Sequence, residues 1–114
     1  MEEDLAELSI IVVEANRSKV NKFRTEYAQH NIHFSCTGMG TIHMLELMEW
    51  DVLFLGHEVE GNEISKWLGE HEDLRPARII IHACDPDVAR NIQGLLPDAT
   101  WYPLALSRSL PDLD

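Results

Sequence analysis

The chain has 114 residues and a mass of 13.0 kDa, with 45% hydrophobic residues and a formal net charge of −11. This length corresponds to one globular domain, and the apolar content excludes a disordered or low-complexity chain. No apolar run reaches the roughly 18 residues that a membrane-spanning helix needs, and the acidic start lacks the basic region of a signal peptide, so no membrane partner is expected.

The balance of charged residues and cysteines narrows the function classes. Acidic residues outnumber basic ones by 20 to nine, which disfavours an extended nucleic-acid groove because such a surface repels the phosphate backbone. A solvated acidic surface is the simplest interpretation, and mimicry of nucleic acid toward a basic partner is the alternative. The two cysteines, Cys36 and Cys84, predict reduced thiols in a cytoplasmic protein.

The first half of the chain alternates between apolar runs and helical periods. Residues 9–14 form a β-branched run that is apolar enough for a strand buried on both faces. Asn16 then caps a helix, and residues 32–36 read as a second strand. A glycine-containing turn is predicted at 37–40, followed by helical spacing at 42–48.

The second half repeats this alternation. Residues 51–55 predict a third strand, and Asn62 can cap the helix that follows. A fourth strand is predicted at 78–81. Asp85 precedes a proline and therefore marks a helix start, and residues 100–106 predict a fifth strand.

The alternation predicts a single doubly wound α/β domain with a five-stranded parallel sheet in the order 2-1-3-4-5. We assign residues 9–106 to this domain, residues 1–8 to an acidic N-terminal extension and residues 107–114 to a short C-terminal tail.

In this strand order, the carboxyl ends of strands 1, 3 and 4 are neighbours, and ligands of such sheets bind in the crevice there. Glu14 follows the first strand, His57 and Glu58 follow the third, and His82 follows the fourth. We therefore expect these side chains to surround one crevice, with the two imidazoles within roughly 10 Å of each other.

The overall pattern resembles a response-regulator receiver domain, although the chemistry of a receiver is missing. A receiver carries paired acids after strand 1, a phosphoacceptor Asp at the end of strand 3 and a Lys-Pro pair after strand 5. This chain has Glu14-Ala15, Gly56 and Tyr102-Pro103 at those places. The sequence therefore predicts a receiver-like fold that is not competent for phosphorelay.

Residues 51–96 resemble more closely the cyclic-phosphate processing receiver domain family. That family shows Asp-His-Asp-Leu-Gly after strand 3, His-Ser-Ala-Asn-Pro after strand 4 and an Asn-Met pair in the next helix. This chain reads Gly56-His57-Glu58-Val59, then His82-Ala83-Cys84-Asp85-Pro86, then Asn91-Ile92, and its Trp67-Leu68 pair is also similar to the family. Both histidines are retained, whereas the first acid is replaced.

The resemblance implies recognition or hydrolysis of a cyclic phosphate, at an RNA end or on a small ligand. His57 and His82 would form an acid/base pair, with Glu58 or Asp85 orienting an imidazole. The substrate-binding candidates are Asn16, Arg17, Asp85, Arg90 and Asn91, at or near two helix N-termini that offer backbone N–H groups. No cofactor is established by the sequence, and a divalent metal held by Glu14, Glu58 and a histidine is compatible with it.

The alternative is a catalytically degenerate receiver-like module that binds a protein partner, as an inhibitor or adaptor. The lost acids and the charge of −11 favour it. The sequence leaves open whether the chain is an enzyme, which would be a phosphodiesterase-type hydrolase. It also leaves open whether His82 is instead a structural hydrogen-bonding residue. A homodimer through strands 4 and 5 fits either hypothesis.

Overall fold

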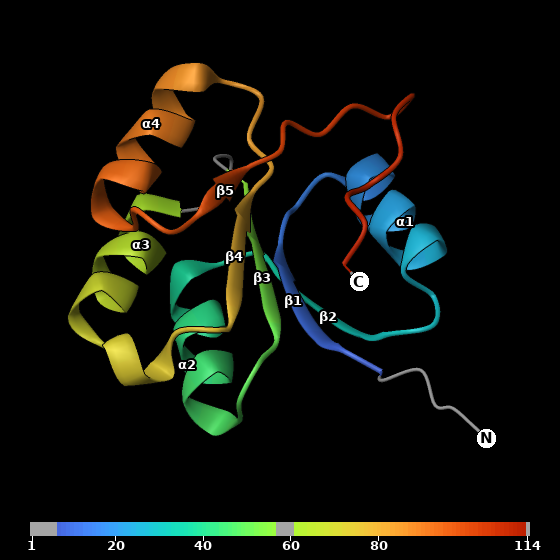
Figure 1. Cartoon of the computed structure of the whole chain (residues 1–114). Helices are drawn as coiled ribbons and strands as arrows, with labels where there is room; N and C mark the ends of the chain where they lie inside the picture. Colours follow the sequence, from blue (N-terminus) through green and yellow to red (C-terminus); the bar gives the residue numbers. More distant parts are fainter. Residues whose placement is uncertain (1–6, 57–60, 114) are drawn as a thin grey trace.

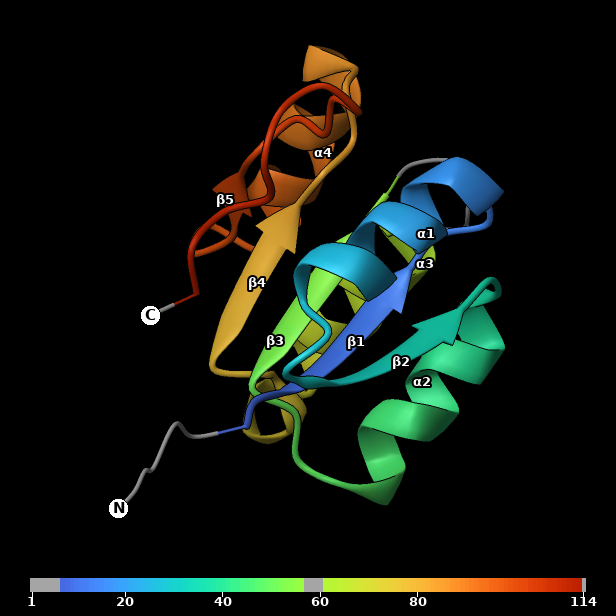
Figure 2. The same ribbon diagram turned by 90° about the vertical axis from the view of Figure 1, so that its right-hand side faces the viewer.

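Five parallel strands form the centre of the computed structural model, which describes residues 7–56 and 61–113 (Figure 1). The strands are β1 (Ser9–Val13), β2 (Asn31–Ser35), β3 (Val52–Leu55), β4 (Arg78–Ile81) and β5 (Thr100–Trp101). They pair in the order β2-β1-β3-β4-β5, and all four pairings are parallel. The predicted fold class and strand order are therefore confirmed, and Figure 2 shows the strands pointing in one direction.

The helices lie on both faces of this sheet. They are α1 (Arg17–Glu26), α2 (Gly38–Leu47), α3 (Gly61–Glu70) and α4 (Pro86–Leu95), with a short 3-10 helix η1 (Glu72–Leu74) after α3. Helices α2, α3 and α4 cover one face and α1 lies on the other (Figure 1). Among the helices of residues 7–56 and 61–113, none has the length and apolar character to cross a membrane.

Two of the predicted helix caps are confirmed. The Asn16 side chain accepts a hydrogen bond from the Lys19 N–H, and that of Asp85 accepts one from the Asp87 N–H. Helix α3 begins at Gly61, one residue before Asn62, and the predicted cap at Asn62 stays a prediction.

Two element boundaries differ from the prediction. The predicted turn at 37–40 is the first turn of α2, because the Thr37 hydroxyl caps that helix by accepting from the Gly40 N–H at 3.0 Å. Strand β5 ends at Trp101 rather than at 106. The Tyr102 N–H still donates to the Ile81 carbonyl of β4, and the Leu104 N–H donates to the carbonyl of His82, the residue after β4. Pro103 between them has no N–H, and the chain then leaves the sheet.

Alternate side chains of the central strands fill two apolar layers. Ile11 and Leu53 belong to the layer under α2, α3 and α4, whereas Val12 and Phe54 pack toward α1. All four are 0% exposed, which confirms the predicted burial of β1 on both faces and shows the same for β3.

Residues 104–113, which we call the strap, cover the sheet beside α1 without forming a helix (Figure 1). Leu104, Leu110 and Leu113 of the strap are buried in the same apolar layer as Phe23. Leu110 and Leu113 of the predicted short C-terminal tail therefore contribute apolar side chains to the core.

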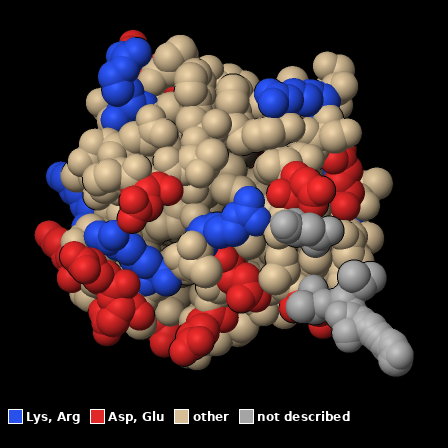
Figure 3. Space-filling view, viewed as in Figure 1, with Lys and Arg blue, Asp and Glu red and all other residues tan. Residues whose placement is uncertain are grey.

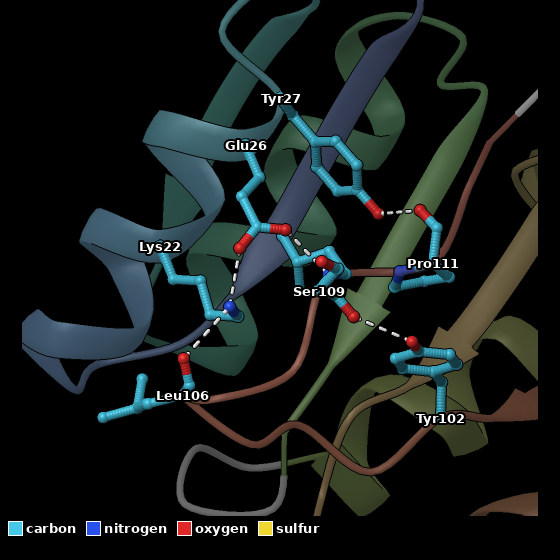
Figure 4. A network of polar contacts seen from close by, with 8 residues as sticks. Lys22, Glu26, Tyr27, Tyr102, Leu106, Ser109 and Pro111 are labelled. Atoms are coloured by element: carbon cyan, nitrogen blue, oxygen red, sulfur yellow. Dashed lines mark hydrogen bonds and ion pairs between the residues drawn. The ribbon is translucent and has the colours of Figure 1, made fainter.

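Side chains of α1 hold the strap through its backbone (Figure 4). The Tyr27 hydroxyl donates to the Pro111 carbonyl, and the Glu26 carboxylate accepts from the Leu110 N–H at 2.7 Å. Burial raises the pKa of Tyr27 well above its usual value, so the hydroxyl keeps its proton and remains a donor. Lys22 links Glu26 to the Leu106 carbonyl in the same network.

Candidate functional site at the carboxyl edge of the sheet

Glu14 and His82 form a buried ion pair or hydrogen bond where β1 and β4 end. Glu14 Oε1 lies 2.7 Å from His82 Nε2, and the two residues are 2% and 1% exposed. Between them in the sheet lies β3, which ends at Leu55 and is followed by Gly56. The topology therefore brings these two predicted site residues together, as expected from the strand order.

The Glu14 carboxylate accepts hydrogen bonds from three donors. Its second oxygen, Oε2, accepts from the backbone N–H groups of Ala15 and Asn16, at 3.1 and 3.0 Å. Burial alone would raise the pKa of Glu14, but the hydrogen bonds from His82 and Asn16 and nearby positive charge outweigh it. The pKa therefore lies below its usual value of 4.5, and the side chain is a carboxylate at neutral pH.

The His82 ring is enclosed by apolar side chains. Because a carboxylate can only accept, the nitrogen facing Glu14, Nε2, carries the hydrogen. The ring packs edge-on to Phe23, with 5.4 Å between centroids, and lies 6.2 Å from Phe54. Its Nδ1 is buried and has no hydrogen-bond partner among the described residues. With 1% of the residue exposed, the imidazole does not reach solvent in this arrangement.

Gly56 makes room for this pair. A Cβ atom built on Gly56 would stand 2.6 Å from His82 Nε2 and 3.1 Å from Glu14 Oε1. No side chain fits there without moving one of two buried polar groups. From the sequence, Gly56 is only the replacement of an acid. Its steric role could not be predicted, because the contact joins three segments that are distant in the chain.

The other predicted catalytic residues, His57 and Glu58, lie outside the described residues. The predicted distance between the two imidazoles therefore stays a prediction, as do the roles of both side chains.

The predicted substrate-binding residues are exposed around the helix starts. Asn16 and Asp85 act as helix caps, and Arg90 pairs with Asp87 at 2.8 Å on the surface of α4. Arg17 and Asn91 are exposed. Within residues 7–56 and 61–113, none of the side chains of these candidates forms a hydrogen bond or ion pair with Glu14 or His82.

The metal hypothesis at Glu14 stays a prediction. In the part of the chain that the structure describes, no three His, Cys, Asp or Glu side chains are grouped so as to hold a metal ion. Both Glu14 oxygens are already engaged by the donors described above, so a metal bound there would have to displace at least one of them.

Solved structures resemble this chain, although no protein-family model and no curated protein matches its sequence. The phosphorylated cyanobacterial phytochrome response regulator RcpA matches with a TM-score of 0.78 and 16% identity, over 90% of this chain and 85% of that one. The fold is receiver-like.

Two further matches support the same conclusion. The receiver domain of a signal transduction histidine kinase from Syntrophus aciditrophicus has a TM-score of 0.70 at 18% identity, over 88% of this chain and 82% of that one. A response regulator from Thermotoga maritima has a TM-score of 0.62 at 17% identity, over 89% of each chain. At these identities the similarity shows the receiver-like fold alone, and the resemblance to cyclic-phosphate processing domains stays a prediction.

Proposed function

We propose that this chain is a receiver-like module that is not switched by phosphorylation and that acts by binding a protein partner. The observation that carries the lack of phosphorylation is the buried Glu14–His82 pair, packed against Gly56 at the edge where a receiver carries its phosphoacceptor. The net charge of −11 is what favours a protein partner.

The carboxyl edge supports this proposal in two ways. Gly56 offers no nucleophile to a phosphodonor, and the space that a phosphoacceptor side chain needs is filled by His82 and Glu14. Among the described residues, the acid packed against Gly56 is Glu14, which is buried with both oxygens accepting hydrogen bonds and is poorly placed to attack phosphorus.

The cyclic-phosphate hypothesis has less support among the described residues. An acid/base histidine must exchange a proton with its substrate at hydrogen-bond distance. His82 is engaged with Glu14 through Nε2, and its other nitrogen faces the buried interior. The hypothesis therefore depends on His57, outside the described residues, and on a rearrangement of His82.

Two incubations test the proposal. The protein is treated with acetyl phosphate or beryllofluoride, with an intact receiver domain as the positive control, and is followed by intact mass and by ¹H–¹⁵N spectra. In parallel it is incubated with 2′,3′-cyclic AMP. We expect no phosphoryl adduct, no spectral change and no turnover. A stoichiometric acid-labile phosphate, or turnover that disappears in His82→Gln, would overturn the proposal.

A further inference from the structure

A groove opens at the amino edge of the sheet, opposite the Glu14–His82 pair. It has a volume of about 350 Å³ and lies between the end of α2, the segment before β3 and the segment that joins η1 to β4. Its apolar lining includes Leu45, Met48, Trp50 and Leu74. The Trp50 indole N–H donates to the Met44 carbonyl, which ties the end of α2 to this wall.

The end of α2 leaves apolar side chains exposed beside the groove. Leu47 is 68% exposed and Met48, which lines the groove, is 43% exposed. Contiguous exposed apolar surface rimmed by polar residues marks interaction sites, and Met48 adds such surface to the apolar lining of the groove.

Acidic side chains surround this apolar lining. The segments 46–51 and 70–73 contain three acidic residues each and no Lys or Arg, and all six acids are exposed. Figure 3 shows acidic side chains gathered over α3 and α2, at the lower left and bottom of that view, with basic side chains between them. Glu49 and Asp73 line the groove, and neither has an ion-pair partner among the described residues.

The backbone adds to the negative potential. The last turn of α2 has no basic residue, so no positive charge of the helix itself offsets the negative end of its dipole where Met48 meets the groove. Arg75 is the basic residue of the lining, and its guanidinium donates to the carbonyls of Leu68 and Gly69 at the end of α3. Two of its donor nitrogens, Nε and Nη2, are therefore turned to α3.

We propose that this groove binds a basic amphipathic segment of a partner protein, an inference that rests on the proposed function and names its surface. Apolar side chains of the segment lie against Met48, Trp50 and Leu74, and its Lys or Arg side chains meet Glu49 and Asp73. The charge of −11 opposes a second copy of this chain as the occupant, and the same acids repel an anionic membrane.

Binding of a synthetic peptide tests the inference. The probe is a labelled helical peptide with leucines along one face and Lys or Arg along the other, followed by fluorescence anisotropy. A matched peptide keeps the leucines and replaces every basic residue with Glu. We expect the basic peptide to bind and the acidic one not to bind.

Two charge reversals of equal size locate the site. Glu49→Lys with Asp73→Lys changes the groove, whereas Glu63→Lys with Asp87→Lys changes exposed acids at the starts of α3 and α4, on the opposite edge. We expect the first pair to weaken binding about tenfold and the second to leave it nearly unchanged. Met48→Glu also weakens binding, and thermal melts confirm that each variant is folded.

Several results would overturn the inference. The inference is wrong if the basic peptide does not bind, if both charge reversals weaken its binding equally, or if Met48→Glu does not change its binding. Self-association of the native chain that Met48→Glu abolishes would make a second copy the occupant. The peptide-binding result does not depend on the incubations with phosphodonors and cyclic AMP. A failure of the groove inference can therefore be distinguished from a failure of the proposed function.

Discussion

Carboxylate side chains have opposite environments at the two edges of the sheet, buried at one and exposed at the other. At the carboxyl edge Glu14 is 2% exposed and bonded to His82 and to two backbone N–H groups. At the amino edge Glu49 and Asp73 are exposed beside an apolar groove. A buried charge is tolerated only with partners, so removing Glu14 or His82 alone would leave the other one buried and unpaired. Exposed acids cost little and remain available to a partner.

The largest contrast is expected when a carboxylate is removed from each edge. Glu14→Ala leaves His82 buried without its partner, and we expect a loss of about 3–5 kcal/mol in the free energy of unfolding. Asp73→Ala should cost at most about 0.5 kcal/mol. Urea unfolding of both variants measures the difference, and equal losses would contradict the assigned roles.

The close approach at Gly56 gives the next largest effect. In Gly56→Ala the new methyl group meets His82 Nε2 at 2.6 Å, and we expect a destabilisation of about 1–3 kcal/mol. Gly94→Ala is the matched control, because Gly94 lies in α4 and an added Cβ meets nothing within 4 Å. That variant should be more stable by about 0.4–1 kcal/mol. If Gly56→Ala were as stable as the native chain, the carboxyl edge would be loosely packed.

Lowering the pH should destabilise the folded protein through the carboxyl edge of the sheet. Because the pKa of Glu14 is lower in the folded protein than in the unfolded chain, its stabilisation is complete above about pH 4.5 and is lost as the pH falls through the folded value. Glu26 contributes in the same direction, since hydrogen bonds from Lys22 and the Leu110 N–H lower its pKa.

Melting curves recorded between neutral and acid pH check this. Glu14→Gln should lose stability less steeply on acidification than the native chain while keeping the contribution of Glu26. Identical pH dependence of the two proteins would show that Glu14 carries no lowered pKa.

The smallest effect is expected at the amino edge. Glu49→Lys with Asp73→Lys should change the free energy of unfolding by no more than about 0.5 kcal/mol per site, while reducing the net negative charge. A chemical denaturation series measures it. A large destabilisation would mean that these carboxylates are structural and not reserved for a partner.

The alternation of apolar runs was sufficient to predict the parallel sheet, and the length of the chain favoured the order 2-1-3-4-5. That order brings Glu14 and His82 to neighbouring strand ends. Their burial was not predictable, since it depends on Phe23 and Gly56 packing from other segments. The strap was also missed as part of the core. The spacing of Leu104, Leu110 and Leu113 follows neither the helix nor the strand period.

The start of α2 shows the limit of local rules. Two glycines within four residues predict a turn, yet the Thr37 cap and the bond from the Thr41 hydroxyl to the Ser35 hydroxyl fix a helix there. The turn preference of the glycines was therefore overridden by a local threonine cap together with a hydrogen bond to the preceding strand.

A double-mutant cycle on Glu14→Gln and His82→Gln tests the central claim most directly, that the carboxyl edge is closed by a structural pair. Urea unfolding of the native chain, the two single variants and the double variant gives their coupling free energy. We predict roughly 0.5–3 kcal/mol of favourable coupling, with both single variants destabilised. A coupling near zero, with single variants as stable as the native chain, would contradict the claim and return His82 to the role of a free acid/base group.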